Sequence, residues 1–192
     1  GRLLLVLISH SEVMGLLGLM LVQESRSLAR TTAQGGLITL EQQDRSLWNH
    51  PQIAEASQLI QRALSMGGFG IYSVQAAIAA VHAEAPSYAE TDWAEIVGLY
   101  NVLLRLSPSP VVELNRAVAL SMCDGASAGL QVVDAISARG ELQGYYLLHA
   151  ARAEFYRQLG QVDLAKLAYE QALALTQQEP ERRFLLGKLA SL

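Results

Sequence analysis

The chain has 192 residues, of which 51% are hydrophobic and 17% are charged, and its formal net charge is −4. This composition supplies a sizeable hydrophobic core, excludes an extensively disordered chain, and suits one large domain or two small ones. Proteins that bind nucleic acid by themselves usually carry a basic stripe. The densest basic spots are Arg182 and Arg183 with Lys188, and Arg26 with Arg30, and both are interpreted as solvated helix faces. We therefore expect no direct contact between this fragment and nucleic acid.

Two apolar runs near the start are too short to span a bilayer, which takes about 20 residues. The first run, at 3–8, resembles the apolar part of a signal peptide, but polar residues interrupt it and no small-residue cleavage pattern follows. We predict that this run and the second run, at 13–22, form buried helices, and we expect no membrane contact. Because no capping residue precedes Leu3, we also expect the chain to be a fragment of a longer protein.

The first helix signal is the pair Ser9 and Glu12, whose S-x-x-E spacing is that of a capping box. It predicts a helix from about residue 11 to residue 28. The following residues, 29–38, lack hydrophobic periodicity and contain two adjacent glycines, which predicts a loop. Residues 41–48 are expected to form one or two helical turns.

Proline and glycine residues divide the middle of the chain into further helices. Pro51 suits the first turn of a helix. The buried stripe of this helix is predicted to comprise Ile53, Ala56, Leu59, Ile60, Ala63 and Leu64. A helix of small residues follows at 72–85, where such residues permit close packing on both sides. Thr91 is predicted to cap the next helix, and Pro110 is predicted to begin another after a sharp break at 107–110.

The last part of the chain is predicted to form helical hairpins. One pair, 111–122 and 127–137, is joined at Gly125 and matches a repeat pattern weakly. The strongest repeat signal lies at 145–175, which we interpret as two antiparallel helices around Gly160. Its small and aromatic residues have the spacing of a tetratricopeptide (TPR) hairpin. These residues are Ala153, Tyr156, Gly160, Ala165, Tyr169 and Ala172. A last helix from Pro180 is expected to cap the stack.

The predicted fold class is therefore all-α, with about ten helices in stacked antiparallel pairs and a TPR-like C-terminal end. Apart from a brief extended stretch expected at 37–40, no strand is predicted. We expect a single all-helical domain over 1–192. Its parts are N-terminal helices at 1–28, an irregular helical part at 41–106, and TPR-like hairpins with a capping helix at 109–192.

Familiar catalytic and cofactor motifs are missing from the sequence. The Gly-Phe-Gly string at 68–70 follows a helix rather than a strand and lacks a third glycine, so it is not a dinucleotide fingerprint. None of the four histidines has a histidine or carboxylate partner at helical metal-site spacing. The single cysteine, Cys123, excludes an internal disulfide and a multi-cysteine metal site, and it fits a cytoplasmic protein. We therefore predict no catalytic residue, no metal and no cofactor.

Polar residues nevertheless recur where the predicted helices should be apolar. They are Asp44, Arg45, Trp48, Gln75, His82, Asp92, Trp93, Asn115, Arg116, His149 and Arg152. Buried charges destabilise a fold unless they are paired. We hypothesise that several of these residues form a polar network between repeats. The network either fixes the register of the helices, forms a docking site for a peptide or another domain, or forms a catalytic or small-molecule site.

Six strings follow one another along the chain. They are LEQQDRSLW at 40–48, YSVQAAIAAVHA at 72–83, TDW at 91–93, SPVVELNRAVA at 109–119, HAARA at 149–153 and ERRFL at 181–185. Together they resemble the C-terminal extension of a group of bacterial extracytoplasmic-function (ECF) RNA polymerase sigma factors, an extension with a TPR-like end. The resemblance covers roughly residues 13–189. Gln42 and Ile71 depart from the family pattern.

The resemblance implies a role in transcription initiation for the whole protein. In that family the extension follows two sigma domains that bind promoter DNA and core polymerase, and this chain contains neither. It implies that the partners of this part are sigma domains of the same chain or core RNA polymerase, with promoter DNA bound only through the missing domains. The family residues that it carries over are Glu41, Asp44, Arg45, Trp48, Gln75, His82, Asp92, Trp93, Asn115, Arg116, His149 and Arg152.

Three functions are compatible with these observations. The first is a non-enzymatic regulatory domain that contacts sigma domains or core polymerase. The second is a free-standing TPR-type adaptor that holds a peptide in a groove. The third is an all-α enzyme, which would have only Asp44, Arg116, His149 and Arg152 as candidate ionisable groups.

Overall fold

The computed structural model describes residues 2–8, 10–33 and 35–192. Within these ranges the regular structure is helical, and the only extended positions are two isolated bridge residues, Thr31 and Leu37. The all-α prediction is therefore confirmed. The α-helices are α1 (Arg2–Leu7), α2 (Ser11–Ser25), α3 (His50–Ser65), α4 (Ile71–Glu84), α5 (Trp93–Leu106), α6 (Pro110–Asp124), α7 (Ala126–Ala138), α8 (Tyr146–Gln158), α9 (Val162–Leu175) and α10 (Glu179–Ala190). Three short 3-10 helices precede α3, namely η1 (Ser27–Ala29), η2 (Leu40–Gln42) and η3 (Arg45–Leu47).

Contacts divide the chain into two compact units. The first unit comprises Gly1–Thr32 and Ile38–Pro108, and the second comprises Ala33–Leu37 and Ser109–Leu192. The main boundary coincides with the sharp break predicted at 107–110. The expectation of a single domain stays a prediction, and each unit is described by itself below.

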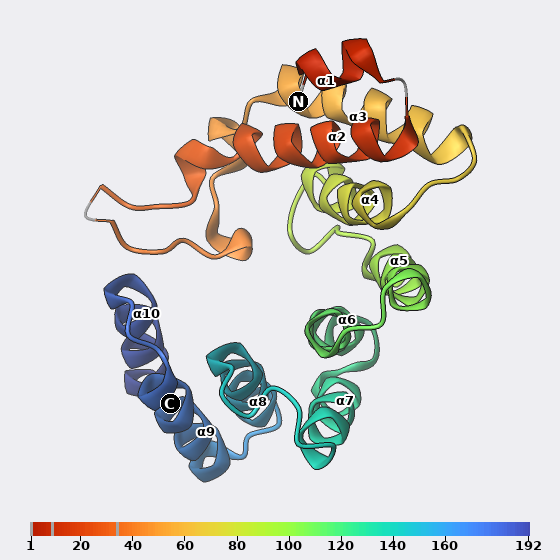
Figure 1. Ribbon diagram of the computed structural model, residues 1–192. Helices are drawn as coiled ribbons and strands as arrows, with labels where there is room; N and C mark the ends of the chain where they lie inside the picture. Colours follow the sequence, from red (N-terminus) through yellow and green to blue (C-terminus); the bar gives the residue numbers. More distant parts are fainter. Residues whose placement is uncertain (1, 9, 34) are drawn as a thin grey trace. The chain divides into compact units, whose positions relative to one another are not determined.

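In the first unit, α2 packs against both α3 and α4, while α5 packs on α4 (Figure 1). Two glycines of α2 make this close approach possible. A Cβ atom on Gly15 would lie 2.6 Å from Ser73 Cα of α4, and one on Gly18 would lie 2.6 Å from Ile60 Cγ1 of α3. Any larger residue would push the helices apart, so the two glycines set the spacing of the unit.

The burial pattern follows the sequence prediction in α3 but not in α1. In α3, Leu64 is half-buried and the other five stripe residues are buried. In α1, Leu3 and Leu7 are 76% and 74% exposed, so the prediction of a buried helix is wrong for these side chains. The reason is that α1 packs mainly on α2 and has few other neighbours. Its contact with α3 is an ion pair between Arg2 and Glu55. No helix in the described ranges combines the length and the apolar character needed to cross a bilayer.

In the second unit, each helix from α6 to α10 packs against the one that follows it in the sequence (Figure 1). The predicted hairpin corresponds to α8 and α9, and Gly160 turns between them with a φ of +73° that favours glycine. Ala153, Ala165 and Ala172 are fully buried where the two helices meet, and Tyr169 is buried beside them. Small residues therefore bring these helices together, as the TPR spacing predicts.

Two helix caps differ from the predictions. α5 is capped by Asp92 rather than Thr91, because the Asp92 carboxylate accepts a hydrogen bond from the Glu95 amide at 2.8 Å. α2 has His10 as its N-cap, and His10 Nδ1 accepts from the Glu12 amide. Ser9, the other half of the predicted capping box, lies outside the described residues.

The Glu12 side chain instead caps a different helix. Its carboxylate accepts hydrogen bonds from the backbone amides of Gly70, Tyr72 and Ser73 at 2.8, 2.9 and 3.0 Å, and from Ser73 Oγ at 2.7 Å. These groups form the N-terminus of α4, which has no local side-chain cap. A residue of α2 therefore supplies the cap that the sequence of α4 lacks.

Candidate functional site

Arg45 lies at the centre of a cluster in the first unit. It stands in η3, whose N-cap Asp44 accepts from the Ser46 amide at 2.9 Å. The Arg45 guanidinium donates to the backbone oxygens of His82 and Ala85 at 2.9 and 2.8 Å. These are carbonyls of the last turn of α4, where a positive charge is favourable. Arg45 therefore fixes the η3 loop to the C-terminus of α4.

Four aromatic rings complete the cluster. Trp48 is only 4% exposed, and the Arg45 guanidinium lies 4.4 Å from the centroid of its ring. The rings of His82 and Trp93 meet edge to face with centroids 5.1 Å apart. Tyr88 packs on Trp93 in the same manner, at 5.2 Å. The structure thus brings together four of the residues predicted from sequence, from η3, α4 and α5.

A further cation, Arg26, belongs to this cluster. It is 8% exposed and its guanidinium lies 5.7 Å from the centroid of the Trp48 ring. The prediction that Arg26 lies on a solvated helix face is therefore wrong. α2 ends at Ser25, so Arg26 leaves the helix and packs against Trp48. Sequence spacing alone does not show this contact, because the two residues are far apart in the chain.

Burial and like charges change the titration of this cluster. Burial, with Arg30 and Arg45 nearby, lowers the pKa of Arg26 to about 10. Burial also lowers the pKa of His82 to about 4, and the positive charges of Arg26 and Arg45 act in the same direction. His82 is therefore neutral at physiological pH.

Several buried polar atoms of the cluster have no hydrogen-bond partner among the described residues. They are Arg26 Nε, one terminal nitrogen of Arg45, Trp48 Nε1 and His82 Nδ1. Leaving a buried donor unpaired costs about 1–3 kcal/mol. The arginine and tryptophan atoms can only donate hydrogen bonds. These unpaired donors are thus suited to hydrogen bonds with acceptor groups.

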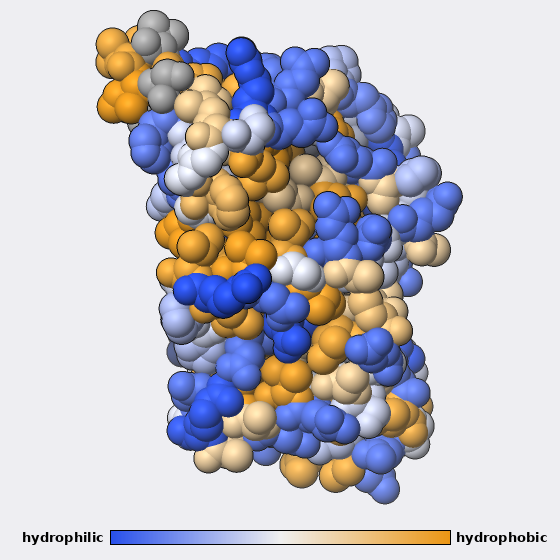
Figure 2. Space-filling model, turned by 90° about the vertical axis from the view of Figure 1, so that its right-hand side faces the viewer, coloured by the Kyte–Doolittle hydropathy of each residue, from blue (hydrophilic) through white to orange (hydrophobic). Residues whose placement is uncertain are grey.

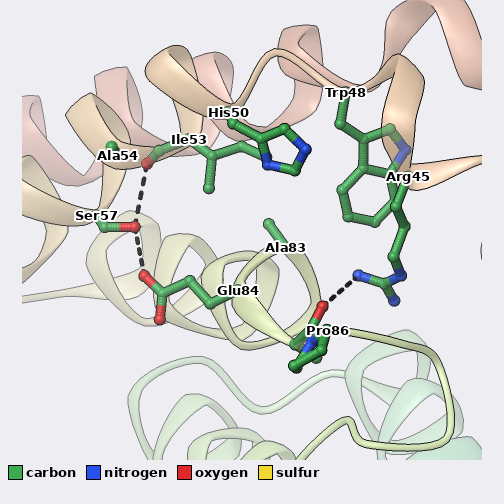
Figure 3. A pocket seen from close by; sticks show the side chains of 10 residues that line it. Arg45, Trp48, His50, Ile53, Ala54, Ser57, Ala83, Glu84 and Pro86 are labelled. Atoms are coloured by element: carbon green, nitrogen blue, oxygen red, sulfur yellow. Dashed lines mark hydrogen bonds between the residues drawn. The ribbon is translucent and has the colours of Figure 1, made fainter.

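A pocket of about 450 Å³ opens beside Arg45 and Trp48 (Figure 3). Its other lining residues are His50, Ile53, Ala54, Ser57, Ala83, Glu84, Ala85 and Pro86. The Ser57 hydroxyl donates to the Ile53 carbonyl at 3.1 Å and bonds the Glu84 carboxylate. In Figure 3, Glu84 and Arg45 lie at opposite sides of the pocket, with apolar side chains between them. The pocket can therefore hold an apolar side chain between two polar groups of its own, Arg45 and Glu84.

The other predicted residues of the first unit lie outside the cluster. Glu41 and Asp44 are exposed, and Gln75 is half-buried in α4. Asp92 is exposed and caps α5. None of these four residues lines the pocket beside Arg45.

In the second unit, His149 and Arg152 connect α8 with its neighbours. His149 is 7% exposed and its ring nitrogens bond the Gln143 carbonyl at 3.0 Å and the Gln171 side chain of α9 at 3.1 Å. Arg152 donates to Asp134 Oδ1 and Ser137 Oγ of α7, each at 2.8 Å. These bonds hold α8 in register with α7 and α9. The remaining predicted residues are exposed Asn115 and half-buried Arg116, both in α6.

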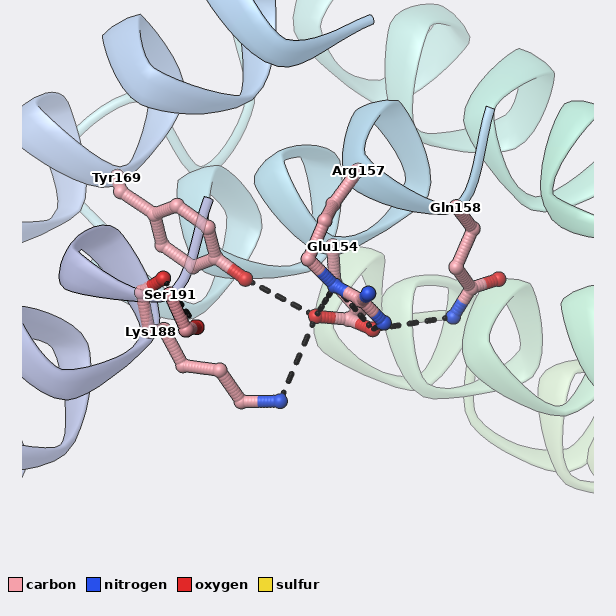
Figure 4. A network of polar contacts seen from close by, with 6 residues as sticks. All are labelled: Glu154, Arg157, Gln158, Tyr169, Lys188 and Ser191. Atoms are coloured by element: carbon pink, nitrogen blue, oxygen red, sulfur yellow. Dashed lines mark hydrogen bonds and ion pairs between the residues drawn. The ribbon is translucent and has the colours of Figure 1, made fainter. Parts of the chain in front are cut away.

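The second unit also contains a network around Glu154 that the sequence analysis did not identify (Figure 4). Arg157 pairs with Glu154 at 2.6 Å, Tyr169 of α9 donates to it at 2.9 Å, and Lys188 of α10 lies 3.6 Å away. Burial would raise the pKa of Glu154, but hydrogen bonds from Arg157, Gln158 and Tyr169 lower it to about 2. The spacing of Glu154 to Arg157 is a sequence signal for the ion pair. The contacts of Glu154 with Tyr169 of α9 and Lys188 of α10 have no comparable signal in the sequence.

Comparisons with known proteins match nearly the whole chain to part of a longer protein. A family described as "Family of unknown function (DUF6596)" matches residues 2–64, which include α1, α2 and the Arg45–Trp48 loop. A protein of Rhizobium meliloti (strain 1021) that is described as uncharacterized is 44% identical over 190 residues. The match covers 98% of this chain and 44% of that relative, so the chain spans less than half of the relative's length. No solved structure matches.

Proposed function

We propose that this chain is a non-enzymatic interaction domain, the C-terminal regulatory part of an ECF-type sigma factor. In this proposal it contacts sigma domains of the same polypeptide or core RNA polymerase, in the cytoplasm. The observation that carries the proposal is the set of six family strings, which occur in order between residues 40 and 185. The relative that matches this chain has more than half of its length outside the match, which leaves room for further domains.

The arrangement of the motif residues agrees with a binding role. Arg45 attaches the η3 loop to the end of α4 beside a pocket with apolar side chains, and Trp48 packs against its guanidinium. His82 and Trp93 meet edge to face at the same end of α4. Hydrophobic side chains also lie at the surface, as Figure 2 shows for the face that it draws. In α9 alone, Val162, Leu164 and Leu167 are exposed. Exposed apolar surface of this kind favours contacts with another protein.

Transcription in vitro tests the proposal. Promoter-dependent transcription by core polymerase is measured with the full-length protein and with a version that lacks the region 1–192. We expect the truncation to change initiation. An unchanged transcription profile would refute a regulatory role. Arg45→Ala in the full-length protein should act in the same direction, whereas Arg62→Ala, at an exposed site in α3 that does not line the pocket beside Arg45, serves as the matched control.

A second candidate is a free-standing TPR-type peptide-binding adaptor, which the α8–α9 hairpin favours. The coding sequence upstream of residue 1 distinguishes the two functions. A region that encodes a helix-turn-helix there supports the sigma-factor proposal, and a start codon immediately upstream supports the adaptor.

A further inference from the structure

A second pocket adjoins the first in the same unit. It has a volume of about 360 Å³, and Ser57, Glu84 and Ala85 line both pockets. The additional lining residues of the second pocket are Ile60, Gln61, Leu64, Ala77, Ala80, Val81, Glu90, Asp92 and Glu95. The Ser57 hydroxyl bonds the Glu84 carboxylate where the two pockets adjoin. We call the two adjoining pockets together the α3–α4 groove.

The floor of the groove is apolar and made of small residues. Ala77 and Ala80 of α4 lie at its base, and Ile60 and Leu64 of α3 form one wall. On α3 the lining runs from His50 to Leu64, about 21 Å at about 1.5 Å per residue. This length fits about four turns of a partner helix. The described residues offer no strand edge beside the groove, so an extended peptide would lack backbone partners there.

The charges around the second pocket all have one sign. Glu84, Glu90, Asp92 and Glu95 line it, and no lysine or arginine does. In the described part of the chain none of these carboxylates forms an ion pair. No group of described residues has the geometry of a metal site. The opposite end of the groove carries Arg45. A bound segment would therefore meet acidic groups at one end and a cation at the other.

We infer that the α3–α4 groove binds an amphipathic helix of a protein partner. Its apolar stripe lies over Ala77 and Ala80, and its lysine or arginine side chains pair with Glu90 and Glu95. This inference deepens the proposed function, because it states where the interaction domain binds and which partner chemistry it selects. Complementary charge gives such an interface its orientation and its selectivity.

The test uses the 192-residue chain and two designed peptides about four helical turns long. Both have leucines at helical spacing. In one peptide lysines flank the apolar stripe, and in the other these lysines are replaced by glutamates. Binding is measured by fluorescence anisotropy for the wild type and for the double variant Glu90→Lys with Glu95→Lys. The matched control, Glu41→Lys with Glu170→Lys, makes the same charge change at exposed sites that do not line the groove.

We expect the lysine peptide to bind the wild type and the control variant, and to shift the methyl resonances of Ala77 and Ala80. The groove variant should weaken its binding about tenfold or more, and the glutamate peptide should bind the wild type more weakly still. Failure to bind, or equal binding to the groove and control variants, would overturn the inference. These outcomes are separate from the proposed function, which fails only if loss of the region 1–192 leaves transcription unchanged.

Discussion

Glu12 is expected to stabilise the first unit from outside the helix that it caps. Its carboxylate accepts three backbone hydrogen bonds and one hydroxyl hydrogen bond at the N-terminus of α4. A Cβ atom on Gly70 would lie 2.8 Å from this carboxylate, so the close approach also requires glycine there. Glu12→Gln keeps the size of the side chain and removes its charge and one acceptor oxygen.

The size of the effect follows from the bonds that are lost. Loss of an N-cap costs about 0.5–2 kcal/mol, and hydrogen bonds to charged groups contribute about 1.5–3 kcal/mol each. Because the Glu12 side chain is only half-buried, solvent screening reduces this sum. We expect a loss of about 1 kcal/mol for Glu12→Gln and about 2–3 kcal/mol for Glu12→Ala. One kcal/mol corresponds to about 2–4 °C in Tm for a protein of this size.

The effect should depend on pH in a defined direction. Burial would raise the pKa of Glu12, but the hydrogen bonds from Ser73, Tyr72 and Gly70 lower it below its ordinary value of 4.5. The stabilisation is therefore complete above the pKa of the unfolded chain and is lost as the pH falls through the lower pKa of the folded chain.

Urea and thermal unfolding, followed by circular dichroism at neutral pH and at decreasing acidic pH, measure the stability difference. Glu24→Gln, at an exposed site of the same helix, is the control. Equal stability of the two variants at neutral pH would refute the reasoning, as would a difference that persists at a pH well below the pKa of Glu12 in the folded chain.

Three further substitutions test the packing and the networks. Gly15→Ala would place a methyl group 2.6 Å from Ser73 Cα and should lower the free energy of unfolding in urea by about 1–3 kcal/mol. The control is Gly98→Ala in α5, where the added methyl group meets open space and should be neutral or slightly stabilising. Arg152→Ala removes the bonds to α7 and should lower Tm; intact partner binding in that variant would argue against docking at this residue. Glu154→Gln should destabilise the protein at neutral pH, and the difference should vanish only as the pH falls from about 4.5 to about 2.

Features set by local sequence were predicted well. The buried stripe of α3 follows from helical periodicity, and Pro51 and Pro110 mark the first turns of α3 and α6. The α8–α9 hairpin follows from its small residues and from Gly160. In each case the signal and the structure that it produces lie within a few residues of each other.

Features set by distant contacts were missed or misplaced. The local sequence predicts that Arg26 lies at the surface, but its guanidinium packs against Trp48. The local sequence predicts Glu12 as half of a capping box, because it carries no signal for the contact with the N-terminus of α4. Thr91 and Asp92 are both good capping residues, and only the geometry of the Glu95 amide decides between them. Within the candidate site, residue types indicated a polar cluster, whereas its membership depended on packing.

The two ends of α4 show how these distant contacts support the proposed groove. A negative charge from Glu12 lies at the N-terminus of α4, and a positive charge from Arg45 lies at its C-terminus. Each charge has the sign that the helix dipole favours at that end. Buried residues of α4, among them Val74 and Ile78, pack it against its neighbours, and the two charged anchors further restrict its sliding and rotation against α2 and α3. Since α4 forms the floor of the α3–α4 groove, the groove is held ready before a partner arrives, and binding then requires less ordering of the protein.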